Sequence, residues 1–498
     1  MKNSFSTFLG VLFLAFINCL SVYSQEEKWT AQMKLRLERM ADSLTVNLKP
    51  WKVPERIFYV EDYGACGDGT TINTVAIQKA IDACSVAGGG VVLFSKGNYV
   101  TGTIRIQSGV MIEVAEGSKI LGSTDINDYP DMIESFKSVM SENYGFRQSL
   151  IYAEKADCIG IRGQGEIYFR GEKANFSSPE TTGPIKDRPL GIRMIECTRV
   201  VLQDILLRNS ASWMQNYLAC KDLIFDGIRV ENQANYNNDG LDPDGCTNVV
   251  VRNCVINAED DAMCIKGASS LPSRNILVEN STFVSTCNAF KIGTDTQGDF
   301  SDIFVRNCVL GGVPESMHSI EGHEASTGIT IATVDGGNVS DIMLTDITID
   351  QARCPVFLRI GNRGRVVPGT AKPKPGKLHR ILIEKVKGKR NFRQGSFISG
   401  ILGYLIEDVC IRNFKIEMLG GGTADMVNQI VGENEAGYPD AHKFQRNGLP
   451  SYGFYVRHAR NINFAGVSVV PTEKDMRPEV FNGGDAVGVS YNGMHVGQ

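Results

Sequence analysis

Short runs of alternating hydrophobic and polar residues fill most of the chain, and one run recurs. In CTNVVVRNCVINAE, which starts at Cys246, a turn and a polar residue precede β-branched residues at alternate positions. Five copies of the run place an apolar residue at the same position, and these residues follow one another at steps of 23, 26, 27 and 27. They are Val200, Leu223, Val249, Ile276 and Ile303. Weaker copies place Ile342, Val409 and Ile462 there. A period of roughly 20 to 30 residues with period-two hydrophobicity predicts an all-β solenoid, for which we expect a right-handed parallel β-helix.

Two segments follow a helical period instead. Residues 26–48 place Trp29, Met33, Leu37, Met40 and Leu44 at steps of three or four. They predict a helix within an N-terminal extension, residues 25–56, which we expect to pack near the start of the solenoid. Residues 72–87 form an amphipathic pattern that three glycines end. We expect this N-terminal capping helix to cover the open end of the strand stack, where unpaired backbone groups would invite aggregation.

The remaining chain, residues 57–498, is expected to form one β-helix domain with long loops. The strand pattern is interrupted at residues 168–190, 364–377 and 420–451, and loops of such length often carry function. Residues 1–24 read as a cleaved signal peptide, with Lys2 before an apolar run. We therefore expect a secreted or periplasmic protein. No later apolar run is long enough to span a membrane.

Composition and net charge limit the classes of partner that the protein is expected to bind. Of 498 residues 42% are hydrophobic, enough for one large core, and the net charge of −5 becomes −6 when Lys2 leaves with the signal. This charge argues against nucleic acid as a partner. Most of the cysteines lie in apolar strand patterns, and Cys197, Cys220 and Cys246 share one repeat position, which predicts an internal ladder of buried thiols. No CxxC or HExxH motif suggests a metal site, and we expect a monomer without a cofactor.

Candidate chemistry concentrates between residues 237 and 267. The five aspartates of this stretch are Asp239, Asp242, Asp244, Asp260 and Asp261. Successive coils of a β-helix stack about 4.8 Å apart, so the 21-residue step from Asp239 to Asp260 predicts that these acids are neighbours. A lone turn aspartate more often caps backbone groups. We give Asp244, in a DPDG turn, this capping interpretation. For Asp242, capping and a functional role are equally favoured.

Several motifs resemble one enzyme family. They are YGACGDG, a GGG turn and LGSTDINDYP between residues 60 and 130, then RPLGIRMIECTRVVLQDILLRNSASW, NNDGLD and the Asp260–Asp261 pair. The chain resembles the polygalacturonases of glycoside hydrolase family 28. The resemblance implies a right-handed parallel β-helix and hydrolysis with inversion, with Asp260 as general acid while Asp239 and Asp261 activate water. Inversion calls for carboxylates roughly 6.5 to 9.5 Å apart.

The sequence departs from the family at two places. Asn288 stands where the family has a histidine, and Lys291 replaces a serine. Thr330-Ile331-Ala332 stands where the family has Arg-Ile-Lys, whose cations hold the carboxylate of galacturonate. Neither Asn nor Thr replaces a guanidinium there. The candidate substrate-binding residues are Asn237, Lys266, Asn288 and Lys291.

Three accounts of these departures stay open. The sugar at the cleavage site is neutral; or it is acidic and held by Lys291, Lys266, Arg359 or Arg363; or hydrolysis has been lost. His318, Glu321 and His323 add polar groups in a loop, which more often lie on the surface.

We expect a secreted glycoside hydrolase, exo-acting on pectin-like or related polysaccharide fragments. A polysaccharide lyase and a non-catalytic carbohydrate-binding β-helix are the alternatives.

Overall fold

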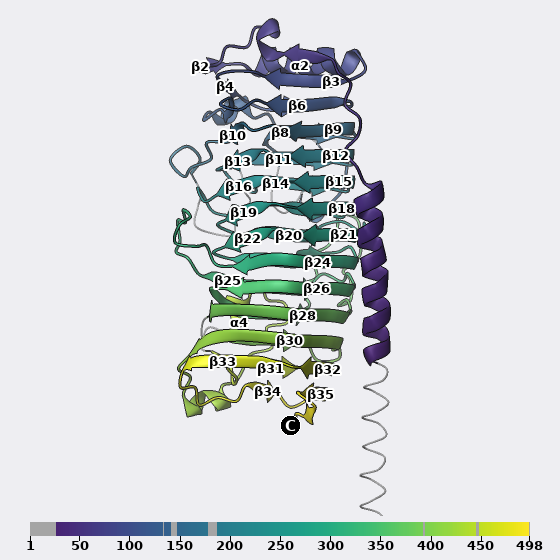
Figure 1. Ribbon diagram of the computed structural model, residues 1–498, viewed down its shortest axis with the longest axis vertical. Helices are drawn as coiled ribbons and strands as arrows, with labels where there is room; N and C mark the ends of the chain where they lie inside the picture. The colour runs from purple at the N-terminus through teal and green to yellow at the C-terminus, as the bar shows by residue number, and fades with distance from the viewer. Residues whose placement is uncertain are drawn as a thin grey trace, which may run out of the picture.

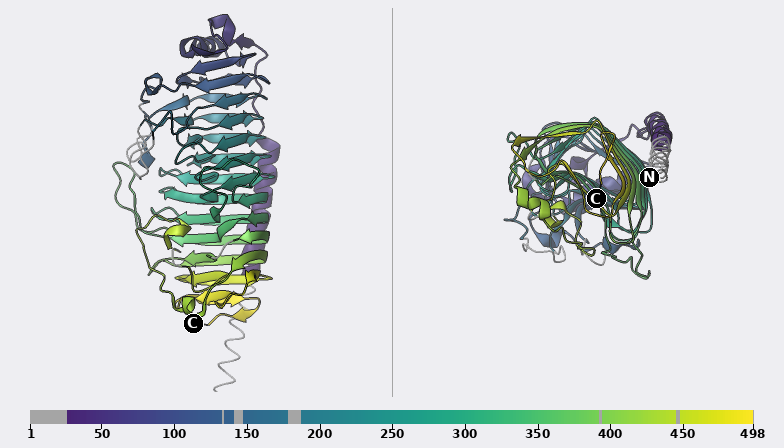
Figure 2. Two further views of the ribbon diagram at one scale, coloured as in Figure 1. Left: turned by 90° about the vertical axis from the view of Figure 1, so that its left-hand side faces the viewer. Right: turned by 90° about the horizontal axis from the view of Figure 1, so that it is seen from below.

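The computed structural model describes residues 26–132, 134–140, 147–177, 187–391, 394–444 and 448–497. The chain winds into coils that stack along one long axis, with the N-terminal coils at one end and the C-terminal coils at the other (Figure 1). Each coil contributes strands to three ladders of parallel strands, and the ladders enclose a common core (Figure 2, right). The predicted parallel β-helix is confirmed.

The first ladder is a separate sheet that is twelve-stranded in the described part of the chain. Its strands are β5 (Ile104–Arg105), β8 (Ser149–Glu154), β11 (Leu190–Ile195), β14 (Gln215–Leu218), β17 (Asp242–Asp244), β20 (Met263–Gly267), β23 (Asn288–Thr296), β25 (Ala325–Thr333), β27 (Ala352–Ile360), β29 (Ser396–Ser399), β31 (Phe454–Arg457) and β34 (Val480–Asn482).

The second ladder runs the length of the solenoid. Its strands are β1 (Ile57–Tyr59), β3 (Gly90–Phe94), β6 (Val110–Val114), β9 (Asp157–Arg162), β12 (Thr198–Gln203), β15 (Lys221–Asp226), β18 (Thr247–Arg252), β21 (Ser273–Glu279), β24 (Phe300–Gly311), β26 (Val339–Asp350), β28 (Leu378–Asn391), β30 (Ile406–Gly420), β32 (Ala459–Ala465) and β35 (Val487–Tyr491), with the short antiparallel β36 (Met494–His495) at its end.

The third ladder merges with the second where β24, β26, β28 and β30 serve both. Its other strands are β2 (Asp68–Ile72), β4 (Asn98–Thr101), β7 (Lys119–Gly122), β10 (Glu166–Tyr168), β13 (Leu206–Arg208), β16 (Arg229–Asn232), β19 (Val255–Ala258), β22 (Thr282–Ser285) and β33 (Ser468–Glu473).

The repeat register agrees with the pairing of the second ladder. Val249 pairs with Leu223 on one side and Ile276 on the other, and all three side chains are fully buried. The polar residue before each repeat position has a left-handed backbone, with φ between 53° and 61° at Arg199, Asp222, Asn248, Asn275, Asp302, Asp341, Arg380, Asp408 and Asn461. Asparagine and aspartate tolerate this conformation best among residues with a side chain. Each coil therefore turns into the second ladder at the same place.

The cysteine ladder is also present. Cys197, Cys220 and Cys246 are buried and free, and the Cys197 N–H donates to the sulfur of Cys220 at 3.4 Å. These thiols pack as small apolar groups inside the solenoid.

A helix covers the first coil, as predicted from residues 72–87. It is α2 (Thr74–Val86), which buries Ile77, Ala80, Ile81 and Cys84. A short 3-10 helix, η1 (Val60–Tyr63), lies beside it. The remaining helical turns that the structure describes with bounds are η2 (Ile126–Asp128), η3 (Ala424–Asn428) and α4 (Ala441–Phe444).

The N-terminal helix, residues 26–47, lies elsewhere than expected. We placed it near the start of the solenoid, but it runs along the side of the middle and later coils (Figure 1). Met33, Leu37, Ala41 and Leu44 cover an apolar stripe on the outer face of the second ladder, formed by Val250, Leu277, Phe304, Met343, Leu382 and Cys410. Ion pairs such as Lys34 to Glu384 at 2.7 Å fasten it. The helix lies here because its apolar face covers this stripe, which would otherwise be exposed to water.

Long loops gather on one side of the solenoid (Figure 2, left). They include the expected excursions, between β10 and β11, between β27 and β28, and between β30 and β31. Residues 178–186 and 445–447 within two of them, and the expected signal peptide at residues 1–24, lie outside the described residues. In the described part of the chain no helix is long and apolar enough to cross a membrane.

Candidate active site

The predicted acids meet where two coils enter the first ladder. Asp239 precedes β17, and Asp260 and Asp261 precede β20. The Gly240 N–H donates to the Asp261 carbonyl at 2.8 Å, and the Asp260 N–H approaches the Asn238 carbonyl at 3.4 Å. The structure thus brings the three aspartates together, one coil apart, through backbone pairing that the repeat dictates.

Lys266, on β20, lies between two buried acids. Its ammonium is 3.0 Å from Asp239 and 3.8 Å from Asp242, and it lies over the Trp213 ring at 4.1 Å from the centroid. Burial favours a lowered lysine pKa, but these carboxylates raise the pKa of Lys266 well above its usual value. Burial also raises the pKa of Asp239 and of Asp242 well above the ordinary range. One ammonium balances one carboxylate, so we assign the negative charge to the closer Asp239 and the proton to Asp242.

Asp261 is held in its charged form. Its burial would raise the pKa, but Lys291, Lys266 and a hydrogen bond from Asn288 outweigh burial and hold the pKa below the usual aspartate value. The Asn288 amide donates to Asp261 at 2.7 Å, and the Lys291 ammonium lies 3.0 Å from the other carboxylate oxygen. The Thr330 hydroxyl in turn donates to the Asn288 carbonyl oxygen at 2.8 Å. The two departures from the family motif therefore form one chain of contacts that orients the Asp261 carboxylate.

Asp260 has the opposite character. Burial, and then the neighbouring charge of Asp261, raise the pKa of its carboxyl to about 6, although Lys291 opposes the shift. Asn237 donates to this carboxyl at 3.3 Å and itself accepts from Arg188 at 3.0 Å. Two adjacent carboxyls with pKa values on opposite sides of the ordinary value are what an acid and a base need.

The structure adds residues that the sequence analysis did not select. Asp440, at the start of α4, is 3.1 Å from Lys291 and 3.4 Å from the Asn288 amide. The Tyr438 ring lies over Lys291, with 5.5 Å between the ammonium and the centroid. Arg188 and Trp213 belong to the quoted motifs RPLG and SASW, so a signal for them was present. Asp440 had none.

Other candidates have structural roles. Arg363 pairs with Asp295 at 2.9 Å and with Asp335, and Arg359 donates to the carbonyls of Gly400 and Glu433. Asp244 accepts a backbone hydrogen bond from Ala268 at 2.7 Å, as its capping interpretation requires. The expected DPDG turn is wrong in one respect. Asp242–Asp244 is strand β17, and the turn comes at Gly245, whose φ is 60°.

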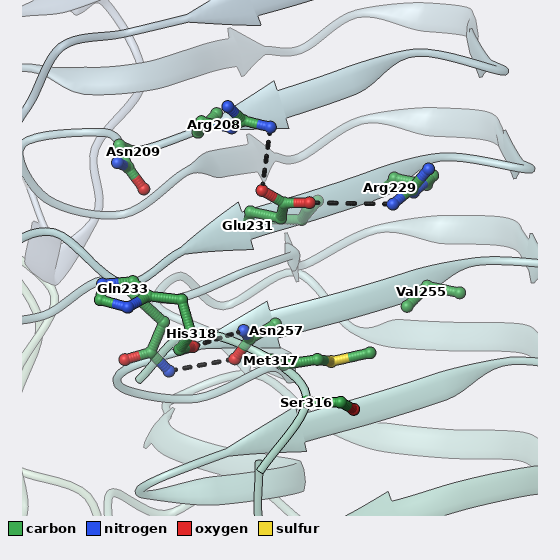
Figure 3. Close-up of a pocket in the computed structure, with 11 residues that line it drawn as sticks. Arg208, Asn209, Arg229, Glu231, Gln233, Val255, Asn257, Ser316, Met317 and His318 are labelled. Carbon is green, nitrogen blue, oxygen red and sulfur yellow. Dashed lines mark hydrogen bonds and ion pairs between the residues drawn. The ribbon is translucent and has the colours of Figure 1, made fainter. Parts of the chain in front are cut away.

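A separate hollow of about 560 Å³ lies against the outer face of β13, β16 and β19 (Figure 3). Glu231 on its wall pairs with Arg208 at 3.1 Å and Arg229 at 3.8 Å. The loop with His318 forms another wall, where the His318 carbonyl accepts from Asn257 at 2.9 Å. His318 therefore docks its loop through the backbone, which fits the surface interpretation of this segment.

One group of donors in the described residues could contact a metal ion. Carboxylate atoms of Asp260 and Asp261 and the Cys287 sulfur lie within 4.8 Å of one another. Lys291, 3.0 Å from Asp261, already supplies a positive charge there. This arrangement suits proton transfer between paired acids better than binding of a divalent cation.

Comparison with known proteins agrees with this geometry. Residues 97–434 match the model of glycosyl hydrolases family 28. A probable polygalacturonase of Vitis vinifera is 25% identical over 381 residues, 72% of this chain and 73% of its own. An exo-poly-alpha-D-galacturonosidase of Dickeya chrysanthemi is 24% identical over 54% of this chain, which spans about half (52%) of that relative.

Solved structures share the fold. The exopolygalacturonase of Thermotoga maritima superposes with a TM-score of 0.67 at 17% identity, covering 87% of this chain and 96% of its own. The family match spans more than half of the chain and includes all three aspartates. The chain therefore belongs to glycosyl hydrolases family 28 and is a polygalacturonase-like glycoside hydrolase.

Proposed function

We propose that this enzyme hydrolyses glycosidic bonds in pectin-like polysaccharide fragments from a chain end, by a single displacement that inverts the anomeric carbon. The observation that carries the proposal is the pairing of Asp260, whose pKa is raised to about 6, with the ionised Asp261 in one buried site. Relatives named as polygalacturonases and exopolygalacturonases support the substrate class.

The general acid lies on one coil, and the residues that activate water come from that coil and its neighbour. Asp260 donates its proton to the leaving glycosidic oxygen, and the ionised Asp261 and Asp239 remove a proton from the attacking water. The facing atoms of Asp260 and Asp261 lie within 4.8 Å, closer than the roughly 6.5 to 9.5 Å of an inverting pair. Inversion therefore requires that the attacking water lies between Asp260 and Asp239, which the neighbouring coil carries.

The first test replaces single acids. Asp260→Asn and Asp239→Asn keep side-chain volume and remove the charge and the proton, and each should lower kcat by about 100-fold or more. The exposed Asp131 supplies a matched control, because Asp131→Asn makes the same chemical change outside the site. Unchanged turnover in both site variants on an oligosaccharide that the wild type cleaves would overturn the assignment.

The same assay separates the alternatives. A lyase would release unsaturated products that absorb ultraviolet light, and a binding solenoid would bind oligosaccharide without releasing any product. Hydrolysis in water enriched in oxygen-18 places one heavy oxygen on the new reducing end. Nuclear magnetic resonance of the first product anomer reports inversion or retention.

We also propose export to the periplasm or the medium, on the signal-like pattern of residues 1–24. Mass spectrometry of the protein from cell fractions tests this proposal. A mature chain that starts near Gln25 supports it, and an intact Met1 or Lys2 terminus in the cytoplasm overturns it.

A further inference from the structure

The cations beside the catalytic acids already have partners. Lys291 is 1% exposed, and its ammonium lies 3.0 Å from Asp261 and 3.1 Å from Asp440. Lys266 faces Asp239 in the same way. Arg363 contacts two other aspartates, and the buried Arg188 donates to the Tyr236 carbonyl and to Asn237. Lys291, Lys266 and Arg363 are therefore each matched by carboxylates, whereas Arg188 is held by neutral acceptors beside Asn237.

Asp440 is held firmly in its position. It belongs to the loop between β30 and β31, residues 421–453, which several buried side chains anchor. Arg457 donates to the Val431 carbonyl at 2.7 Å, and Arg359 donates to the Glu433 carbonyl at 2.6 Å. Phe444 of α4 packs on Phe357 and Phe397, with ring centroids less than 6 Å apart. The loop therefore places a carboxylate on Lys291 as a fixed part of the site.

The neighbouring positions are neutral. Thr330 and Asn288 are fully buried, and their polar atoms serve each other and Asp261. Around Lys291 there are thus two carboxylates, an amide and a hydroxyl. A sugar carboxylate brought to this place would face Asp440 and Asp261, while Lys291 is already paired with both of them, and like charges at short range in a buried site repel strongly.

We infer that the sugar lying against Lys291 and Asp440 is uncharged, and that Asp440 is the residue that rejects a uronate there. This inference rests on the proposed hydrolysis and names the substrate more closely: the cleaved bond has a neutral sugar on at least one side, as in a branched or mixed oligosaccharide. A hydroxyl group of that sugar can donate to the carboxylate of Asp440, because an ionised carboxylate is a strong acceptor.

The direct test identifies the two sugars that flank the cut. The full chain is incubated with mixed pectic oligosaccharides in oxygen-18 water, and the labelled reducing end and the new non-reducing end are identified by mass spectrometry. A neutral sugar on either side supports the inference. A uronate on both sides overturns it and leaves the hydrolase proposal standing. That proposal fails separately if Asp260→Asn cleaves as fast as the wild type.

A second test changes the selecting residue. Oligogalacturonides and the same compounds with carboxyls reduced to primary alcohols form a matched pair that differs only in charge. The measured quantity is the affinity for the oligogalacturonide divided by the affinity for its reduced, neutral partner. Asp440→Asn should raise this ratio by about tenfold. Asp425→Asn, at an exposed position of the same loop, should leave it unchanged. Binding is measured by calorimetry in the Asp260→Asn background, and the fold is checked by circular dichroism.

An unchanged ratio in folded Asp440→Asn, or tighter wild-type binding of the uronate than of its reduced partner, contradicts the inference.

Discussion

At the scale of single residues, the pKa of Asp260 sets the pH dependence. A general acid works only while protonated, and the pKa of this carboxyl is about 6. The protonated fraction therefore falls as pH rises through 6, and kcat/KM should drop about tenfold per unit beyond it. Asp261, whose pKa lies below the usual value, stays ionised as pH falls toward about 4, so its own ionisation does not limit activity over that range. A pH profile of kcat/KM checks this, and a rising limb above pH 6 would contradict it.

Thr330 offers a second test at this scale. Thr330→Val keeps the shape but removes the hydroxyl that donates to Asn288. Asn288 then loses orientation toward Asp261, and we expect kcat to fall about tenfold while KM changes little. Thr282→Val on β22, a half-exposed position of another ladder, is the matched control. An equal loss in both variants would point to general destabilisation instead.

The sequence predicts some site residues and misses others for a physical reason. Asp239 and Asp260 are one coil apart, so the repeat period alone makes them neighbours. Asp440 lies 152 residues beyond its contact Asn288, in a loop without strand periodicity. No register connects such a loop to the coils, because its path depends on packing of Phe444 and on carbonyls bound by buried arginines. Contacts of that kind leave no local pattern in the sequence.

At the scale of elements, the repeat register makes a stability prediction. Val249 and Ile276 are fully buried partners on β18 and β21. Truncating either to Ala should lower the free energy of unfolding by about 2 to 4 kcal/mol, because the stacked coils cannot close the cavity. Val309→Ala on β24, where the side chain is 40% exposed, should cost much less. Denaturant titrations compare the three, and losses as small as that of Val309 at both buried sites would argue against the register.

The N-terminal helix shows what a pattern leaves open. Its period predicts the helix but not the surface beneath it. A signal for that surface exists, because the strands carry continuous apolar triplets, Val249-Val250-Val251 and Ile276-Leu277-Val278. A continuous apolar run of this kind is typical of a strand whose two faces are both covered. The middle residue of each triplet faces the helix, while the outer two face the core.

This packing can be tested in the helix itself. Leu37 is fully buried against the stripe, so Leu37→Ala should cost about 2 to 5 kcal/mol of docking energy. The exposed Leu35→Ala is the control on the same helix. Limited proteolysis in the segment 48–56 should cut the Leu37 variant faster, because the helix detaches more often. Equal cutting rates would show that the stripe does not hold the helix.

At the scale of the whole molecule, the loops on one side of the solenoid bear on the mode of action. The loop after β30 places Asp440 and Tyr438 against Lys291, and the chain that leads into β11 places Arg188 against Asn237. Walls that come so close to the acids favour binding of a chain end over a groove open along several coils. We therefore expect exo-action on short or decorated oligosaccharides.

A time course on long polygalacturonate and on mixed oligosaccharides, with viscosity and chromatography in parallel, measures this. Exo-action gives one small product from the first minutes while viscosity stays high. A rapid fall in viscosity with a ladder of mid-length products would show that a long chain threads past these loops.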